Sequence, residues 1–182
     1  MISVAEAIQA LKRGEVIAYP TEAVYGLGCD PTNETALQTL LALKQRSATK
    51  GLIVVAAEFA QLENFVKPIS SALLETILAT WPGPYTWVFP AKPIVSKLIR
   101  GDQPTIAVRI SAHPVIQQLC RSFGPLISTS ANKTENTPIR EAHTITKIFG
   151  PEIKIVAGEL GSLQNPTSIR DALTGKILRS CT

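Results

Sequence analysis

The chain has 182 residues, of which 45% are hydrophobic and 18% are charged, and its formal net charge at pH 7 is +4. This composition excludes a disordered chain and suits one globular domain, expected over residues 1–182, and the modest charge permits an anionic partner. The longest apolar stretch, residues 52–57, is far below the roughly 20 residues that cross a bilayer, and Glu6 interrupts any N-terminal signal segment, so we expect a cytoplasmic protein.

Two helices and a strand are expected near the N-terminus. Ser3 and Glu6 have the spacing of a capping box, so we predict a helix over residues 4–13. Residues 16–19 form a short β-prone run, and from Asn33 apolar residues recur at helical spacing. We expect a loop between this strand and the second helix.

Short β-prone runs then alternate with helical patterns. Residues 113–122 and 140–148 have the pattern of helices. The other strands are expected at residues 52–57, 86–89, 106–110, 126–129, 153–156, 167–169 and 176–178. This alternation indicates an α/β protein with one sheet. We expect parallel pairing where a helix separates consecutive strands and a hairpin after residue 167, so the sheet should be mixed.

Three cations, Lys44, Arg46 and Lys50, directly precede the buried run at residues 52–57. Cations are common at the C-terminus of a helix, which would explain Lys44 and Arg46 as solvated charges. Lys50 is harder to explain in this way, because from the start of a buried strand it could point into a crevice at the edge of the sheet. An anion with several charges would explain all three cations.

The segment AYPTEAVYGLGCDP, residues 18–31, runs from a strand end into a loop that contains Thr21, Glu22 and Tyr25. Loops of this kind carry ligands in α/β folds, but a tight turn with a packed tyrosine is an equally good interpretation. The glycines do not form a dinucleotide fingerprint, and the chain contains no Walker A sequence.

Polar groups also gather at the ends of two later strands. STSAN, residues 128–132, places hydroxyls and an amide after an apolar run, where they could bind carboxylate, phosphate or ribose oxygens, or simply form a turn. Arg109 lies inside a β-prone run, so its guanidinium needs an exposed edge or a buried anion. An acidic residue of the protein itself could be that anion.

The remaining reactive side chains argue against several kinds of chemistry. The three cysteines are widely separated, which predicts reduced thiols instead of a disulfide framework or a zinc site. The carboxylates are scattered, and no Ser-His-Asp or His-rich metal pattern occurs in the sequence. Nucleophilic catalysis and a tightly held metal are therefore disfavoured.

Six short segments occur in an order that is typical of one protein family. They are PTEAVYGL (20–27), Lys44-x-Arg46, WPGP (81–84), Val108-Arg109, Ser130-Ala131-Asn132 and NPTSIRDALTGKILR (165–179). Each segment alone is a weak signal, but together they cover nearly the whole chain. On these motifs the chain resembles the YrdC family in its short, single-domain bacterial form.

The resemblance implies a fold and an activity. The fold is a twisted, mixed sheet with helices on its faces and a concave, positively charged cavity. The activity is that of a nucleotidyltransferase, threonylcarbamoyl-AMP synthase, in which L-threonine, bicarbonate and ATP give threonylcarbamoyl-AMP and diphosphate. A separate transferase complex uses the product to modify adenosine 37 of tRNAs that read codons beginning with A. An Mg²⁺ ion held mainly by the ATP phosphates is also implied.

The resemblance further assigns roles to individual residues, with no side chain expected to ligate a metal. The cations expected to act in catalysis at the ATP phosphates are Lys44 and Arg46. The other residues expected to contact ATP are Lys50, Ser130, Asn132 and Arg179. The residues expected to contact threonine are Thr21, Arg109, Ser128, Thr167 and Ser168.

Three positions depart from the family pattern. Thr134-Glu135 stands where members commonly have Ser-Gly, which affects the contacts of that loop with the nucleotide. Ala23 takes a position that is often threonine, and Val55 one where some longer members carry histidine. The contacts with threonine are therefore expected to differ somewhat from the family pattern.

A different interpretation of the cations is a module that binds double-stranded RNA or tRNA without catalysis, because phosphate contacts need no chemistry. The STSAN cluster beside the cations favours a small ligand with several negative charges. We expect weak RNA binding alongside the synthase activity, and hand-over of the adenylate to the transferase complex.

Overall fold

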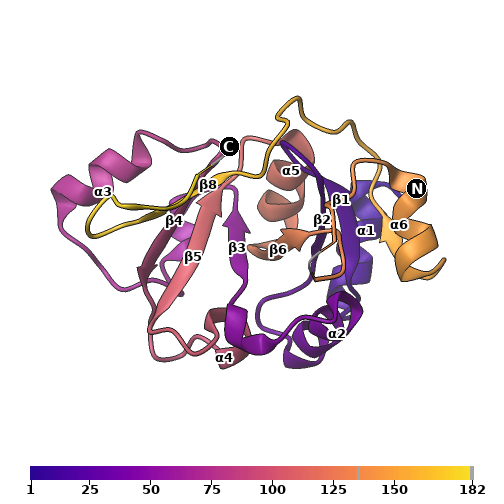
Figure 1. Cartoon of the computed structure of the whole chain (residues 1–182), viewed down its shortest axis with the longest axis horizontal. Coiled ribbons are helices and arrows are strands. Elements are labelled where there is room, and N and C mark those ends of the chain that lie inside the picture. Colours follow the sequence, from indigo (N-terminus) through magenta and orange to yellow (C-terminus); the bar gives the residue numbers. More distant parts are fainter. Residues whose placement is uncertain (135, 181–182) are drawn as a thin grey trace.

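The strands form one mixed sheet whose order differs from their order along the chain. The computed structural model describes residues 1–134 and 136–180. The strands are β1 (Ile17–Pro20), β2 (Tyr25–Gly28), β3 (Ile53–Ala56), β4 (Tyr85–Pro90), β5 (Thr105–Ile110), β6 (Leu126–Ser130), β7 (Lys154–Ile155), β8 (Ser168–Asp171) and β9 (Ile177–Arg179). Across the sheet the order is β7-β1-β2-β6-β3-β5-β4-β8-β9 (Figure 1).

Helices connect the strands and cover both faces of the sheet. The α-helices are α1 (Val4–Lys12), α2 (Glu34–Lys44), α3 (Ser71–Leu78), α4 (Lys97–Arg100), α5 (Pro114–Phe123) and α6 (Ala142–Phe149). Two short 3-10 helices are η1 (Ala48–Lys50) and η2 (Phe59–Leu62). The helical patterns predicted α1, α2, α5 and α6, whereas α3, α4, η1 and η2 were not predicted. Among the described residues, no helix combines the length and the apolarity needed to cross a membrane.

The strand pairing confirms the mixed sheet but corrects one expectation. β8 and β9 form the predicted hairpin, and β1 with β7, β3 with β5 and β4 with β8 are the parallel pairs. The expectation that consecutive strands separated by a helix pair with each other in parallel is wrong. β4 and β5, between which we expected no helix, pair antiparallel through a loop that contains the single turn α4. Helices α2, α5 and α6 connect strands that are not neighbours in the sheet.

β2 occupies part of the segment that we expected to be a loop. It pairs with β1 on one side and with β6 on the other. Its two glycines lower the β-propensity of the segment, which favoured the loop prediction. Gly28 lies so close to β6 that an added Cβ would stand 2.3 Å from the carbonyl oxygen of Ile127. The loop prediction is therefore wrong for residues 25–28. The glycine at position 28 allows the β6 backbone to approach closely and does not mark a loop.

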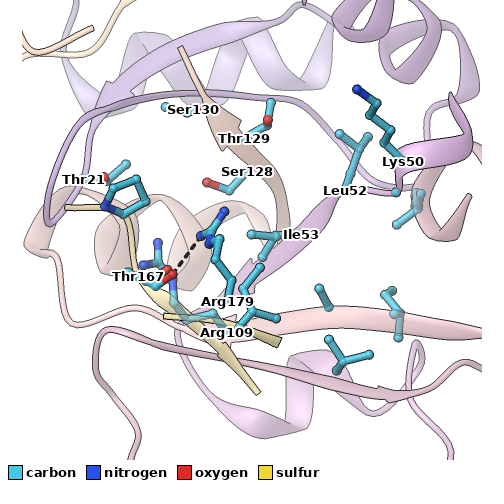
Figure 2. A pocket seen from close by; sticks show the side chains of 18 of the residues that line it. Thr21, Lys50, Leu52, Ile53, Arg109, Ser128, Thr129, Ser130, Thr167 and Arg179 are labelled. Carbon is cyan, nitrogen blue, oxygen red and sulfur yellow. Dashed lines mark hydrogen bonds between the residues drawn. The ribbon is translucent and has the colours of Figure 1, made fainter. Parts of the chain in front are cut away.

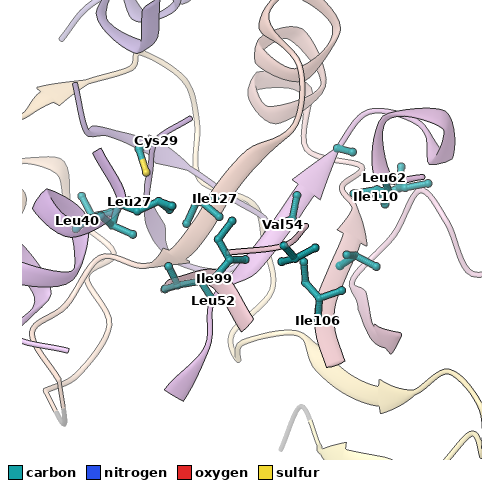
Figure 3. Close-up of a cluster of buried hydrophobic side chains, with 14 of the residues drawn as sticks. Leu27, Cys29, Leu40, Leu52, Val54, Leu62, Ile99, Ile106, Ile110 and Ile127 are labelled. Atoms are coloured by element: carbon teal, nitrogen blue, oxygen red, sulfur yellow. The ribbon is translucent and has the colours of Figure 1, made fainter. Parts of the chain in front are cut away.

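Side chains of the central strands alternate between two apolar layers on opposite faces of the sheet. Val54 of β3 belongs to a layer that also contains Leu40 of α2 and Ile99 of α4 (Figure 3). Val55, the next residue, packs instead in a layer that includes Leu119 of α5. Both faces of β3 are therefore buried in apolar surroundings along most of the strand.

The capping box at the start of α1 provides a direct test of local stability. The amide of Glu6 donates to Ser3 Oγ at 3.3 Å, and the amide of Ser3 donates to the Glu6 carboxylate at 2.7 Å. We expect Ser3→Ala to lower the free energy of unfolding by about 1 kcal/mol in chemical denaturation. The matched control is Ser70→Ala, because Ser70 occupies the N-cap of α3 without a side-chain capping bond. An equal loss in both variants would contradict the capping explanation.

Candidate functional site

A cavity of about 400 Å³ lies on the face of the sheet that carries α5 (Figure 2). Ile53 of β3, Arg109 of β5 and Ser128 of β6 contribute side chains to its wall. Ile53 shares a face of β3 with Val55, since side chains two residues apart point the same way. The cavity therefore continues the α5 layer toward the start of β3, and its volume suits a small-molecule ligand.

The cavity wall is basic. The charged side chains among its lining residues are Arg46, Lys50, Arg100, Arg109 and Arg179, and none of the lining residues is acidic. Of these five cations, only Arg109 forms an ion pair within the part of the chain that the structure describes. The remaining four therefore contribute positive charge that no carboxylate of the described residues cancels by ion pairing.

Arg109 lies in a buried network with Glu22 and Ser111. Arg109 is only 6% exposed, and its Nη2 lies 3.3 Å from Glu22 Oε2. Ser111 Oγ donates to Glu22 Oε1 at 2.6 Å. Burial alone would raise the pKa of the Glu22 carboxyl, but Arg109 and Ser111 together lower it, so the carboxylate is the stable form. The anionic partner that a guanidinium in this strand required is thus Glu22.

Several predicted residues surround Arg109. Arg179 Nη2 donates to the carbonyl oxygen of Thr167 at 2.7 Å (Figure 2), and burial together with the nearby Arg109 lowers the pKa of Arg179. Thr21, Ser128 and Thr167 also line this part of the cavity. Arg179, expected at the nucleotide, therefore lies beside the residues that were expected to contact threonine.

Two of the predicted cations lie at the other end of the cavity. Arg46 Nη2 donates to the carbonyl oxygens of Gly51 at 2.8 Å and of Lys50 at 3.3 Å. Its Nε has no hydrogen-bond partner within the described residues, and burial lowers the pKa of the guanidinium. Lys50 is exposed and lines the cavity at this end (Figure 2). Arg46 thus fixes the start of β3 and keeps other N–H donors for a ligand.

Lys44 lies behind the cavity wall and is not one of its lining residues. It is 2% exposed, and its Nζ donates to the carbonyl oxygen of Ser130 and, at 2.8 Å, to that of Asn132. Burial, with a smaller effect of Arg46, lowers the pKa of Lys44 to about 8. This ammonium therefore ties the end of α2 to the end of β6 and the loop after it, and these two carbonyls use two of its three N–H donors.

The loop after β6 is held by its own side chains. Ser130 Oγ donates to Asn132 Oδ1 at 2.6 Å, and Asn132 Nδ2 donates to the carbonyl oxygen of Asn136 at 2.6 Å. Ser130 lines the cavity, whereas Asn132 does not. Thr134 donates to the carbonyl oxygen at the end of α2, and Glu135 lies outside the described residues. Asn132 therefore shapes the loop that presents Ser130.

The structure leaves two other predicted positions away from the cavity wall. Ser168 is 4% exposed and does not line the cavity, and Val55 packs in the α5 layer. Ala23 does line the cavity, so its small side chain bears on the shape of the site. Arg100 and Gln103 line the wall as well, and sequence reasoning missed them because α4 was not predicted. No sequence pattern connects these two residues to the other cations.

The fold and the cavity define an α/β protein with a basic, small-molecule-sized pocket on its sheet. A family model for Sua5, YciO and YrdC, described as telomere recombination, matches residues 9–181. The chain belongs to this family, which confirms the resemblance carried by its six motifs.

Curated relatives and a solved structure extend this finding. The threonylcarbamoyl-AMP synthase of Coxiella burnetii is 50% identical over 179 residues, which are 97% of this chain and 96% of that protein. The enzyme of the same name from Yersinia pestis is 50% identical over 178 residues, or 96% and 94% of the two chains. P. abyssi Sua5, solved in complex with L-threonine, is 31% identical with a TM-score of 0.86, covering 92% of this chain. The chain spans only 50% of the length of that Sua5 chain.

The buried position of Lys44 predicts a pH-dependent contribution to stability. Its pKa of about 8 in the folded chain lies below the ordinary value of 10.5. Between these two values the unfolded chain holds this proton while the folded chain has released it. We expect the free energy of unfolding of the native chain, relative to that of Lys44→Met, to rise with pH across this interval.

Chemical denaturation at pH 8, 9 and 10 measures this difference. Lys12→Met, which removes an exposed lysine of α1, is the matched control for the loss of one positive charge. A difference that stays constant or falls with pH would contradict the buried ammonium described above.

Proposed function

We propose that the protein is an L-threonylcarbamoyladenylate synthase, which converts L-threonine, bicarbonate and ATP into threonylcarbamoyl-AMP, diphosphate and water. The observation that carries this proposal is the division of the basic cavity into two ends. Arg109 lies among hydroxyl groups at one end, and Arg46 with Lys50 lies at the other. The curated relatives that are 50% identical over nearly the full chain bear the name of this enzyme, which supports the same assignment.

The end around Arg109 suits an amino acid. A guanidinium binds a carboxylate through directed, charge-assisted hydrogen bonds, and Arg109 is already oriented by Glu22. The hydroxyls of Thr21, Ser128 and Thr167 line the same end and can donate to or accept from a polar ligand. The P. abyssi Sua5 structure with L-threonine has the same fold over 92% of this chain, which supports threonine as the ligand here.

The end around Arg46 and Lys50 suits the phosphates of ATP. In the proposed reaction the threonine amine and bicarbonate first form N-carboxylated threonine with loss of water. A carbamate oxygen then attacks the α-phosphorus, and diphosphate leaves as the bond to its bridging oxygen breaks. Negative charge develops on the phosphoryl and leaving oxygens, and fixed cations stabilise it without reorganisation. Holding both substrates in one cavity lowers the entropic part of the barrier. No nucleophile from the protein is needed.

The remaining predicted site residues take supporting roles in this proposal. Ser130 would reach the nucleotide from the end of β6, and Asn132 and Lys44 would position this strand end and the loop after it. Arg179 would lie between the two substrates, since it is close to Arg109 and lines the cavity. Ser168 lies behind the wall and would act only through the strand that carries it.

We infer that an Mg²⁺ ion enters with the nucleotide. Among the described residues, no group of His, Cys, Asp and Glu side chains could hold a metal ion, and the oxygen donors of the cavity wall are hydroxyls, amides and carbonyls. Magnesium keeps several waters and is often held by substrate phosphates, so this donor set fits a phosphate-held ion. When bound, it would neutralise phosphate charge, whereas positioning is left to the side chains described above.

The partners of the product follow from the proposed reaction. We infer that the adenylate is handed to a transferase complex that modifies adenosine 37 of tRNA, and that the protein works in the cytoplasm. The relatives reported above carry the name of the synthase, which favours it over an RNA-binding module without catalysis. Weak, salt-sensitive binding of tRNA or double-stranded RNA stays a prediction.

The first test of this proposal is substrate dependence. We expect release of diphosphate to require L-threonine and bicarbonate together with ATP. Serine should be several-fold to tens-fold poorer, because losing one methyl contact costs roughly 1 kcal/mol. A coupled assay for diphosphate with each substrate omitted in turn measures this, and equal release without any amino acid would rule out the synthase.

The second test concerns Arg46. We expect Arg46→Ala to lower kcat by roughly a hundredfold, because a preorganised donor to developing phosphate charge is lost. Arg46→Lys should also be impaired, since an ammonium cannot reproduce two directed bonds. The lost bonds to the carbonyl oxygens of Lys50 and Gly51 should lower the free energy of unfolding by about 1 kcal/mol.

Turnover and denaturation midpoints of both variants separate these effects. Arg121→Ala is the matched control, because Arg121 is an exposed arginine of α5 away from the cavity wall. Near-normal turnover in Arg46→Ala would mean that Arg46 only fixes the backbone.

A further inference from the structure

The two ends of the cavity differ in how much of their positive charge is cancelled. At one end, Arg46 donates only to backbone carbonyls and Lys50 forms no ion pair within the described residues, so both keep their full charge. Arg100, whose turn α4 packs against η1, also lines the cavity and forms no ion pair within the described residues. At the other end, Arg109 and Arg179 are neighbours. The Glu22 carboxylate forms an ion pair with Arg109 but not with Arg179. The first end therefore carries three uncancelled positive charges, and the second carries about one.

The distance between the ends is large enough for them to hold different groups. Arg46 is bonded to the carbonyl oxygen of Gly51, and Arg109 stands opposite Val55 in the β3–β5 register. The four residues from Gly51 to Val55 correspond to roughly 13 Å of extended chain. Figure 2 likewise has Lys50 on one side of the cavity and Arg109 with Arg179 on the other.

Glu22 is held against Arg109 without lining the cavity, so it lowers the net charge at this end without contacting a ligand. It does not line the cavity, and its side chain is 11% exposed. Ser111 Oγ donates to one carboxylate oxygen, while the other lies 3.3 Å from Arg109 Nη2 and has no hydrogen bond within the described residues. The Glu22 carbonyl also accepts from the amide of Leu163, which fixes its backbone.

We propose that Glu22 is a specificity-determining residue that acts through Arg109 and reserves this end of the cavity for a singly charged carboxylate. Without Glu22, Arg109 and Arg179 would form a pair of uncancelled guanidiniums, which is a typical binding site for a polyanion. With Glu22 in place, the net charge matches one carboxylate, and a polyphosphate is directed to Arg46 and Lys50. This inference rests on the proposed function for the identity of the two substrates.

The test counts binding sites for inorganic pyrophosphate by isothermal titration calorimetry. The native chain should bind one pyrophosphate. Glu22→Gln keeps an oxygen that accepts from Ser111 but removes the negative charge. This variant should bind a second pyrophosphate, with a Kd at least tenfold lower than that of any weak second site of the native chain. The second site should disappear in the double variant Glu22→Gln with Arg109→Gln. Glu22→Asp, which keeps the charge, should behave like the native chain.

The kinetic counterpart is competition between the substrates. In Glu22→Gln the KM for threonine should rise several-fold as the ATP concentration is raised, whereas in the native chain it should not. Glu159→Gln is the matched control, because Glu159 is an exposed acid whose backbone, not its side chain, contacts His113 beside this network. A generally loosened fold would not create a pyrophosphate site that depends on Arg109.

The outcomes separate this inference from the proposed function. If Glu22→Gln gains no second pyrophosphate site while the native chain is an active synthase, the role of Glu22 is overturned alone. If the native chain shows no threonine-dependent turnover but the second site appears and depends on Arg109, the synthase fails and the charge-sorting role of Glu22 stands. Should Glu22→Gln not fold, Glu22→Ala, which removes the same charge with a smaller side chain, takes its place: a second site that is lost with Arg109→Gln would support the inference, and an unchanged single site would contradict it.

Discussion

The rest of the site depends on the buried positive charge of the Arg109 guanidinium, which must be compensated by nearby groups. Removing an ion from water costs several kcal/mol unless an anion and further hydrogen bonds compensate it. Glu22 comes from the loop after β1 and Ser111 from the end of β5, so this one requirement joins two distant parts of the chain. The amide of His113 at the start of α5 donates to the same serine at 3.1 Å. A substrate carboxylate would therefore meet a guanidinium that is already fixed.

The other cations near the cavity serve the backbone as well as a ligand. Lys44 holds two carbonyls at the end of β6 and in the loop after it, and Arg46 holds two carbonyls before β3. Neutral acceptors satisfy N–H donors without cancelling charge, so these contacts stiffen the wall and leave it positive. This arrangement explains how a small protein can crowd cations beside its core: they replace missing backbone partners where a helix and a strand end.

Local sequence patterns predicted most of the sheet but not the way in which it is assembled. The capping box of Ser3 and Glu6 marked α1, and the hairpin after Thr167 followed from a short connection. The glycines of β2 suggested a loop, because their use becomes apparent only when β6 lies against them. The order of the strands was not predicted either, because helices α2, α5 and α6 connect strands that are not neighbours in the sheet.

The sequence by itself determined most of the strands, the helices α1, α2, α5 and α6, the family and the side chains that could meet anions, because these depend on residue type, spacing and motif order. Only the tertiary structure decided which cation meets which partner. Lys44 and Arg46 are two residues apart, yet one is buried under carbonyls and the other lines the cavity. Glu22 and Arg109 are distant in sequence and form the ion pair of the site. Burial and ion pairing depend on distances across the sheet, which the spacing of residues along the chain does not contain.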